Sequence, residues 1–375
     1  MVDPRRPETD ARIAKLRGDI GRSLEDVSTP ALILDPAVAR RNIETMGTRI
    51  AALPAGLRPH IKVHKSAELA RLQLDAGALG VTTATAAEAV AMAEAGVPDV
   101  LVASEVVSPV AIARLAQAAR ISRIRVVVDD AGVLTATGRA ALEAGVELGV
   151  LVDVDVGLDR GGARSIEETL RLAELAAASD GVSFDGVMGY EGHCASEPDD
   201  TLRAAEAGRA MGRLADAAAA CRGAGLEVGI VSAGATGTFE VTGAATEVTE
   251  VQAGSYVLMD HFHAPLVDGF GFALTVMATV IGRHGDLLVL DAGRKSVDTS
   301  LRPLEPPDPR ATLAFVHEEH VGFRYTGEAP GAVGDRVHIV PGYAPTTVNL
   351  FGAYHVVEDG RVIDVWPVLA RHGDP

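Results

Sequence analysis

The chain has 375 residues, of which 47% are hydrophobic and 23% are charged, and its formal net charge is −17. This length accommodates one large barrel and a smaller domain, and the composition is that of an ordinary globular protein. Because the charge is negative and no basic stripe occurs, we expect neither nucleic acid nor an anionic membrane as a partner. No apolar run approaches the ~18 to 20 residues of a membrane span.

The N-terminal segment, residues 1–27, is predicted to be helical over residues 10–24. Residues 1–22 are charged throughout and lack the apolar centre of a secretory signal. Only Cys194 and Cys221 occur, without the spacing of a metal finger. These observations favour a reducing, cytoplasmic location.

Residues 28–260 alternate short apolar runs with alanine-rich amphipathic stretches. Repeated β/α alternation implies a parallel sheet, and strands covered on both faces favour a closed (β/α)8 barrel of the TIM type. A doubly wound open sheet is the alternative, but no G-x-G-x-x-G follows the first run. The predicted strands are Ala31–Leu34, Arg58–Val63, Gly80–Thr85, Val100–Ser104, Ile124–Val128, Leu148–Asp155, Phe184–Tyr190 and Val228–Ala233.

Residues 261–375 have a different sequence pattern, because helical alanine runs are replaced by strand-like segments separated by turns. This pattern predicts a second, mostly antiparallel β domain. Its predicted strands are Ala273–Ile281, Leu287–Asp291, Thr312–Val316, Arg336–Ile339, Ala353–Val357 and Arg361–Trp366.

The segment Arg58–Ser66 holds two of the few lysines in a chain that otherwise uses arginine. The other lysines are Lys15 and Lys295. Lysine can lose its proton and attack a carbonyl group, whereas arginine cannot. The segment also covers the end of a predicted strand, Arg58–Val63, and strand ends are where a barrel enzyme carries its chemistry. The residues alone leave two interpretations open, which are a lysine that forms a Schiff base and two solvated cations at the start of a helix.

This segment, read as RPHIKVHK, resembles the RPHxKTHK signature of the pyridoxal-phosphate enzymes related to D-threonine aldolase and D-serine dehydratase. Those enzymes have an alanine-racemase-type barrel followed by a β domain. The resemblance implies that Lys62 carries the cofactor as a Schiff base. Val63 departs from the usual threonine of the signature.

Two glycine-bearing segments are candidates for a phosphate cradle. Ser232–Thr238 follows a predicted strand, and its glycines and threonines let backbone and hydroxyl donors approach an anion, although an ordinary turn has the same composition. Gln252–Asp260 resembles the family's Q-x-G-x-Y-x-x-M-D, whose glycine and following residue contact the phosphate. The candidate phosphate-binding residues are Thr236, Gly237, Thr238, Gly254 and Ser255.

Two further motifs end predicted strands. Asp153–Gly162 contains a match to D-V-G-x-x-R-x-G, and the resemblance implies that Arg160 lies beside the cofactor ring. Gly189–His193 resembles G-Y-E-G-H, which implies that Tyr190 lies near the cofactor and that His193 reaches the substrate. Histidine titrates near neutral pH and is suited to proton transfer. His193 is the first candidate base and His64 the second; a surface arginine and a structural histidine are the alternatives.

The metal ligands of the resembling family are replaced in this chain. Relatives bind a divalent cation through a His-x-Cys or His-x-Asp pair that precedes a T-V-N-like segment, whereas here Tyr343 and Pro345 occupy those positions. Proline has no donor atom and tyrosine is a rare ligand for such a cation. We therefore expect the family's metal site to be lost and Tyr343 to orient the substrate hydroxyl. A relocated metal on His261 or His263 is the alternative, although residues two apart on a strand point to opposite faces.

The expected function is that of a pyridoxal-phosphate lyase that cleaves or forms the Cα–Cβ bond of D-β-hydroxy amino acids, in the manner of a D-threonine aldolase. Alternatives are a D-serine dehydratase-like ammonia lyase, an amino-acid racemase, and a non-catalytic carrier of pyridoxal phosphate. The resemblance also implies a homodimer.

Overall fold

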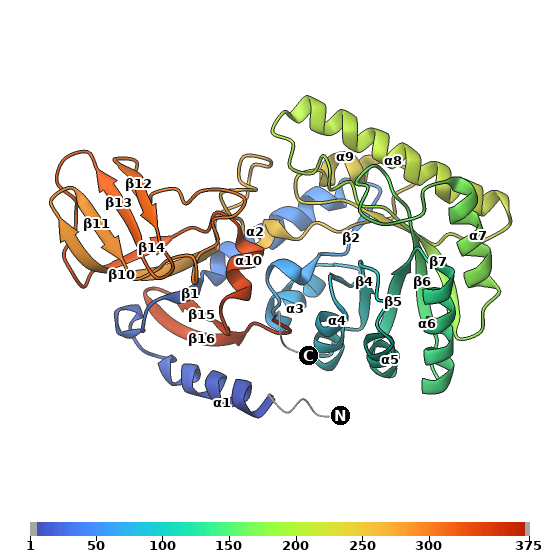
Figure 1. Ribbon diagram of the computed structural model, residues 1–375, viewed down its shortest axis with the longest axis horizontal. Coiled ribbons are helices and arrows are strands. Elements are labelled where there is room, and N and C mark those ends of the chain that lie inside the picture. The colour runs from blue at the N-terminus through green and yellow to red at the C-terminus, as the bar shows by residue number, and fades with distance from the viewer. Residues whose placement is uncertain (1–5, 372–375) are drawn as a thin grey trace. The chain divides into compact units, whose positions relative to one another are not determined.

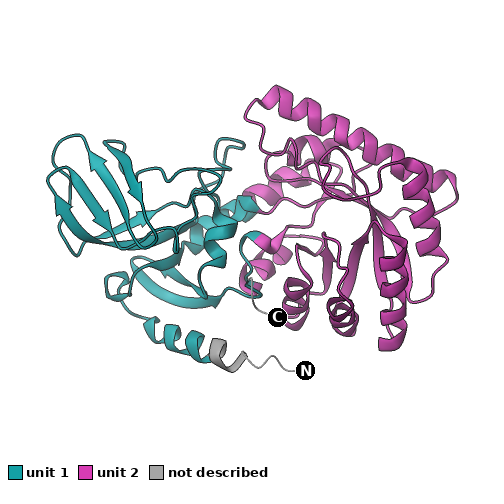
Figure 2. Ribbon diagram, in the orientation of Figure 1, with its two compact units in different colours: residues 1–43, 63–66, 255–375 teal, residues 44–62, 67–254 magenta. Residues whose placement is uncertain are grey.

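The computed structural model describes residues 6–371 (Figure 1). The chain divides into two units that do not follow the order of the sequence (Figure 2). Unit 1 comprises residues 1–43, 63–66 and 255–375, and unit 2 comprises residues 44–62 and 67–254. Unit 2 is therefore inserted into the sequence of unit 1. The boundaries 28–260 and 261–375 stay a prediction, and this division differs from them in placing residues 28–43 with the C-terminal part.

Unit 2 contains an eight-stranded parallel sheet in the order β2-β9-β8-β7-β6-β5-β4-β3. Its two outer strands also meet, because the amide of Thr82 donates to the carbonyl of Pro59 at 2.9 Å and His60 pairs with Thr82 in a parallel bridge. The sheet curls into a TIM-type barrel, as predicted. Its strands are β2 (Gly56–Leu57), β3 (Val81–Thr83), β4 (Asp99–Val102), β5 (Arg123–Val128), β6 (Leu148–Asp153), β7 (Val182–Met188), β8 (Ile230–Ala233) and β9 (Glu250–Val251).

The helices of the barrel begin at polar residues that cap them directly after a strand. The hydroxyl of Thr85 accepts from the amide of Glu88, and the carboxylate of Asp130 accepts from the amides of Gly132 and Val133. Such caps satisfy amides that have no partner within a helix. The helices in or entering unit 2 are α2 (Pro36–Ala51), α3 (Ala67–Asp75), α4 (Ala86–Glu94), α5 (Pro109–Ala118), α6 (Ala131–Ala144), α7 (Ile166–Ala177), α8 (Asp200–Gly223) and α9 (Phe239–Ala244).

The prediction that residues Ala31–Leu34 form the first strand of the barrel is wrong. Residues Ala31–Leu34 form β1 in the sheet of unit 1, antiparallel to β10 and parallel to β15. All four residues are buried, and such a run has the same pattern in a barrel as in the middle of an antiparallel sheet. The eighth strand of the barrel is instead β9. It has only two residues, which are too few for a hydrophobic period to be visible in the sequence.

Unit 1 contains a mostly antiparallel sheet in the order β12-β13-β11-β10-β1-β15-β16, with β14 beside β10, and the predicted β domain is thus confirmed. Its strands after β1 are β10 (Leu274–His284), β11 (Leu287–Leu290), β12 (Ala311–Val316), β13 (Val321–Tyr325), β14 (Arg336–Ile339), β15 (Ala353–Glu358) and β16 (Arg361–Pro367). The helix predicted over residues 10–24 is shorter and starts earlier, as α1 (Arg6–Leu16), and 3-10 turns follow it. None of the helices within residues 6–371 is long and apolar enough to cross a membrane.

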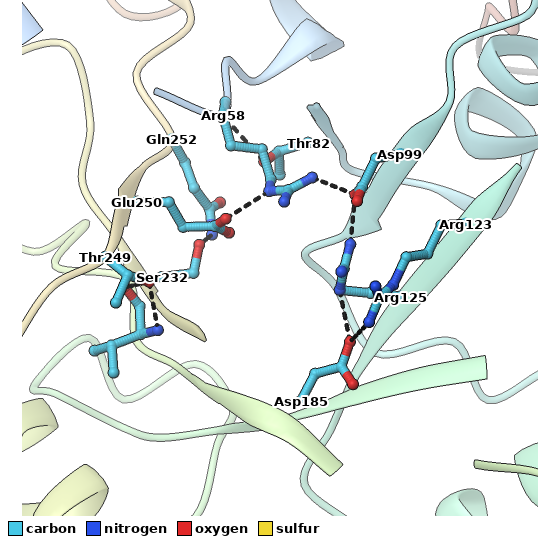
Figure 3. A network of polar contacts seen from close by, with 11 residues as sticks. Arg58, Thr82, Asp99, Arg123, Arg125, Asp185, Ser232, Thr249, Glu250 and Gln252 are labelled. Atoms are coloured by element: carbon cyan, nitrogen blue, oxygen red, sulfur yellow. Dashed lines mark hydrogen bonds and ion pairs between the residues drawn. The ribbon is translucent and has the colours of Figure 1, made fainter. Parts of the chain in front are cut away.

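A buried ionic network joins residues in or next to five strands of the barrel, β2, β4, β5, β7 and β9 (Figure 3). Arg58, which follows β2, donates to Glu250 at 2.8 Å and to Asp99 at 2.5 Å. Asp99 also accepts from Arg125, which donates to Asp185 at 2.7 Å. The side chains of Arg58 and Glu250 are only 4% and 2% exposed. Removing one member would therefore leave a buried charge uncompensated.

Candidate active site

Lys62 lies in a 3-10 turn, η3 (Ile61–Val63), which follows β2 at the carboxyl edge of the barrel. Its Nζ atom is 5.7 Å from the centroid of the Tyr190 ring, and the Cζ atom of Arg160 is 5.6 Å from the same centroid. Burial, and after it the charge of Arg160, lowers the pKa of Lys62, while Glu88 opposes this change. A lysine with a lowered pKa is a better nucleophile toward a carbonyl group. The structure thus brings together three of the residues that the sequence predicted to form the site.

The other lysines have different surroundings. Lys65 donates from Nζ to the carbonyl of Ala370 at 3.0 Å and belongs to unit 1. Lys295 pairs with Glu319 at 2.7 Å, and its side chain is 67% exposed. Lys15 is exposed on the N-terminal helix. Lys62 is therefore the lysine whose environment fits a reactive amine.

Arg160 is carried by a tight loop that returns to the end of β6. The amide of Asp155 donates to the carbonyl of Ala163, and the amide of Ala163 donates back to Asp153. Gly162 has a φ of +92°, which favours glycine, and its amide donates to the carboxylate of Asp129 at 3.0 Å. The loop that holds Arg160 is thus fixed by backbone hydrogen bonds at the end of β6 and by the carboxylate of Asp129, which follows β5.

The carboxyl group of Asp153, at the end of β6, lies in an environment that favours its protonated form. Asp153 is 6% exposed. Burial, followed by the hydrogen bond and negative charge of Glu105, holds the pKa of Asp153 well above its usual range, and Arg160 only partly offsets this. Burial and a neighbouring negative charge both disfavour the ionised form of Asp153. The sequence alone assigned no role to the side chain of Asp153 or to Glu105.

Asp153→Asn should gain stability relative to the parent protein as the pH rises. A raised pKa in the folded state gives a stabilising contribution that is complete below the unfolded pKa of about 3.9 and is lost as pH rises through the folded pKa. Asparagine donates a hydrogen bond to Glu105 at every pH, so the variant has no such loss. Thermal unfolding of both proteins between pH 4 and pH 9 measures the difference. A destabilisation that is the same at every pH would contradict the raised pKa of Asp153.

The cradle after β8 is organised by Glu191, which is fully buried. Its carboxylate accepts from the amide of Gly234 at 3.1 Å and from the hydroxyls of Thr238 at 2.6 Å and Thr242 at 2.7 Å. The amide of Thr238 donates to the carbonyl of Ala235. Both donors of Thr238 are therefore engaged inside the loop, and this residue shapes the cradle. Glu191 was part of a quoted motif, but the sequence gave no signal for its role.

Gly254 brings the end of β9 against the segment that carries Lys62. A Cβ atom at this position would lie 2.3 Å from the carbonyl oxygen of His60, so only glycine fits. The next residue, Ser255, opens the 3-10 turn η4 (Ser255–Val257) and belongs to unit 1. Thr236 and Gly237 lie in the turn between β8 and α9. The cradle residues of unit 2 thus come from the carboxyl ends of adjacent strands.

The predicted bases differ in exposure. His193 is exposed, and its ring lies so close to Gly157 that a Cβ atom there would come within 3.1 Å of His193 Cε1. His64 is fully buried in unit 1, where its Nδ1 accepts from the amide of Ser66 at 3.1 Å. The hydroxyl of Tyr354 donates to the backbone carbonyl of His64 at 2.6 Å. The contacts of His64 hold its ring and backbone in place.

Tyr343 and the two candidate histidines of the C-terminal part lie in unit 1. Tyr343 is the residue before α10 (Ala344–Asn349). His261 and His263 lie in a turn and not on a strand, so the expected alternation of faces does not apply. They still contact different carboxylates, Glu305 for His261 and Asp260 for His263. Within residues 6–371 no group of three histidine, cysteine or carboxylate side chains has the arrangement of a metal site.

Known proteins share this architecture over nearly the whole chain. The crystal structure of D-threonine aldolase from Filomicrobium marinum superimposes with a TM-score of 0.90 and 33% sequence identity, covering 94% of this chain and 98% of that chain. Residues 34–261 match the family described as "Alanine racemase, N-terminal domain", and residues 273–357 match the "Putative serine dehydratase domain". The chain belongs to this alanine-racemase-type family.

Relatives with a named activity are similar over the same length. D-threonine aldolase from an Arthrobacter species is 36% identical, and the match covers 94% of each chain. 3-Hydroxy-D-aspartate aldolase from Paracoccus denitrificans is 33% identical, again over 94% of each chain. Both relatives are named for aldol chemistry on a D-amino acid.

Proposed function

We propose that this chain is a pyridoxal-phosphate-dependent lyase of the aldolase type, which cleaves or forms the Cα–Cβ bond of D-β-hydroxy amino acids. The observation that carries the proposal is the environment of Lys62. Its amine is partly buried, has a lowered pKa, and shares the ring of Tyr190 with the guanidinium of Arg160. The two named aldolases among its relatives supply the substrate class.

The donor set fits pyridoxal phosphate. Lys62 would hold the cofactor covalently, and Arg160 and Tyr190 would fix its ring. The phosphate would be held by Thr236, Gly237, Gly254 and Ser255, with Glu191 and Thr238 shaping the cradle. The narrow approach at Gly254, which a Cβ atom would fill, suits backbone contact with an anion. When bound, the cofactor supplies an electron sink that stabilises negative charge at Cα.

The substrate class follows from what the relatives' substrates share. D-threonine and 3-hydroxy-D-aspartate both carry a hydroxyl group on Cβ beside a D-configured Cα. Cleavage needs a base for this hydroxyl and a donor that orients it. Tyr343 is proposed as the orienting donor. His193, at the carboxyl end of a barrel strand, is proposed to act at the substrate, and His64 as its alternative.

A dehydratase is the second candidate, because residues 273–357 match a serine dehydratase domain. Dehydration releases an α-keto acid and ammonia, whereas aldol cleavage releases glycine and an aldehyde. Racemisation would return the opposite enantiomer. A non-catalytic carrier of the cofactor would give none of these products. The products therefore separate the candidates.

Incubating the purified protein with D- and L-forms of threonine, phenylserine and serine should give glycine and aldehyde from the D-forms only. Exhaustive chelation should leave the rate unchanged within about twofold, since Tyr343 and Pro345 supply no suitable ligand pair for a divalent cation. Chiral chromatography and an aldehyde assay measure the products. Loss of activity with chelator and its return with manganese or zinc would contradict metal independence.

We also propose a cytoplasmic homodimer. Both cysteines, Cys194 and Cys221, are buried and free, which suits a reducing compartment. The dimer is carried over from the resemblance to the family. Light scattering of the purified protein at micromolar concentration would give the mass of a single chain if the dimer is absent.

A further inference from the structure

A buried arginine joins the two loops that follow β7 and β8 in unit 2. Arg203 lies in the first turn of α8, and its side chain is 9% exposed. Its Nε atom donates to the carbonyl of Gly237 at 2.9 Å, and its Nη1 atom donates to the carbonyl of Glu197. Gly237 belongs to the proposed phosphate cradle, and Glu197 lies in the loop between β7 and α8. Helix α8 packs beside α9, which begins directly after the cradle (Figure 1).

The same guanidinium also contacts an acidic side chain at the surface. Its Nη2 atom donates to Asp200 at 2.5 Å, and the Asp200 side chain is 83% exposed. Ion pairs with an exposed partner contribute little, because water screens them. Hydrogen bonds from a charged donor to buried carbonyl groups are stronger than neutral ones. Of these three contacts of Arg203, the two with loop carbonyls therefore have the larger effect.

The contact with Arg203 lies at the tip of the cradle. The amide of Thr238 donates to the carbonyl of Ala235 at 3.2 Å, which closes a turn with Thr236 and Gly237 at its centre. Arg203 binds the carbonyl of Gly237, so the partial negative charge of this oxygen faces a cation. Within residues 6–371, the amide of Gly237 donates to no other residue. A turn with its carbonyl held and its amide available suits an anion.

A negative charge holds the same turn from the end of β7. Glu191 is fully buried and accepts from the hydroxyl of Thr238 and from the amide of Gly234. Glu191 directly follows Tyr190, whose ring centroid is 5.7 Å from the Nζ atom of Lys62. The contacts of Glu191 thus attach the cradle to the strand end that carries Tyr190.

The two charges at the cradle have opposite signs and share a neighbour. Burial, followed by the charges of Glu191 and Glu206, raises the pKa of Cys194 to about 11, and the charge of Arg203 opposes this change. A buried carboxylate behind the cradle repels a phosphate dianion, and a nearby cation offsets the repulsion. Removing Arg203 would leave the charge of Glu191 without this offset. A ligand that lacks the phosphate would not experience the difference.

We propose that Arg203 positions the phosphate cradle and gives the site its preference for pyridoxal phosphate over pyridoxal, which lacks the phosphate. Arg203 binds the carbonyl of Gly237, so that this oxygen does not face the anion, and it offsets the charge of Glu191. It is a positioning residue, because it acts through the cradle and not on the reacting atoms. This inference rests on the proposed function, since it takes the loop after β8 as the phosphate site. The residues that it invokes all belong to unit 2.

The decisive experiment measures the dissociation constants of pyridoxal phosphate and of pyridoxal by equilibrium dialysis, using full-length protein freed of cofactor. In Arg203→Met the constant for pyridoxal phosphate should rise by about 10- to 100-fold, which is the effect of losing a charge-assisted hydrogen bond. The constant for pyridoxal should stay within about twofold, because this ligand does not use the cradle. Arg203→Lys keeps the charge but cannot span both carbonyls, so its effect should be smaller, about 3- to 10-fold.

Arg209→Met is the matched control on the same helix. Arg209 pairs with Glu206, but its side chain is 58% exposed, so both dissociation constants should stay within about twofold of the parent values. Inorganic phosphate serves as a probe that lacks the pyridine ring. It should raise the unfolding temperature of the cofactor-free parent and of Arg209→Met, because a ligand that binds the folded state stabilises it. In Arg203→Met the increase should be smaller or absent.

The outcomes separate failure of this proposal from failure of the proposed function. If the parent binds neither ligand, the proposed function fails and this proposal fails with it. If the parent prefers pyridoxal phosphate and Arg203→Met keeps the same preference, this proposal is overturned and the proposed function stands. If Arg203→Met weakens both ligands equally, its role is structural and the proposal is again overturned. Should Arg203→Met fail to fold, an unchanged preference in Arg203→Lys would decide against the proposal.

Discussion

Replacing Lys62 with alanine should abolish turnover. The loss of proton transfer alone should lower the rate by about 10²- to 10⁴-fold, and loss of the covalent attachment adds to this. Borohydride reduction of the parent protein followed by peptide mass spectrometry should find the cofactor on the peptide that contains Lys62. This assignment rests on the lowered pKa of Lys62 and on the position of its amine near the ring of Tyr190, which Arg160 also approaches.

Lys295→Ala is the matched control for this prediction. Lys295 is 67% exposed and pairs with Glu319 on the surface of unit 1, so its replacement should leave the rate within about twofold. A reduced cofactor found on Lys65 or Lys295 would refute the role of Lys62. Full activity of Lys62→Ala would do the same.

The second large effect concerns stability and lies at Arg58. Arg58→Met should lower the free energy of unfolding by about 3 to 5 kcal/mol, because it leaves the buried carboxylate of Glu250 without its counter-charge. Glu250 is 2% exposed, and one of its oxygens already has no hydrogen-bond partner within the described residues. Water cannot easily compensate such a group. Urea unfolding followed by circular dichroism measures the change.

Arg123→Met tests whether burial is the cause. Arg123 belongs to the same network and contacts Asp185 at 3.1 Å, but its side chain is 60% exposed. Loss of the Arg123 side chain should lower the free energy of unfolding by no more than about 1 kcal/mol. Equal destabilisation by the two variants would show that the network acts as a whole and that the burial of Arg58 is not decisive.

The sequence predicted the elements that have a strong local signal. The strands of the C-terminal part were found because turns such as residues 284–286 and 358–360 separate them, although β13 (Val321–Tyr325) was missed. The barrel followed from its alternation of strands and alanine-rich helices. The assignment of β1 failed because a four-residue buried run does not show which partner strand it will have.

The sequence placed Lys62, Arg160 and Tyr190 after strand ends, and the structure brings these three side chains together, while their roles stay predictions. Roles that depend on long-range partners were not predictable. Glu191 contacts residues of the loop after β8, and Asp153 contacts Glu105 two strands away, so no local pattern marks either carboxyl group. The pairing of His263 with Asp260 also depends on a turn that the local sequence did not reveal.

The nesting of unit 2 within unit 1 sets an order of events during synthesis. The edge of β1 that pairs with β10 has no partner until a segment far downstream has been synthesised, because Ala31 pairs with Met277. All strands of the barrel leave the ribosome before that partner exists, and domains generally fold as units during translation. In the interval β1, a fully apolar run, has no sheet to join, and an unpaired apolar strand invites aggregation. Once the barrel has formed, it brings the two flanking segments closer than a flexible chain of that length would, which lowers the entropy cost of completing the second sheet.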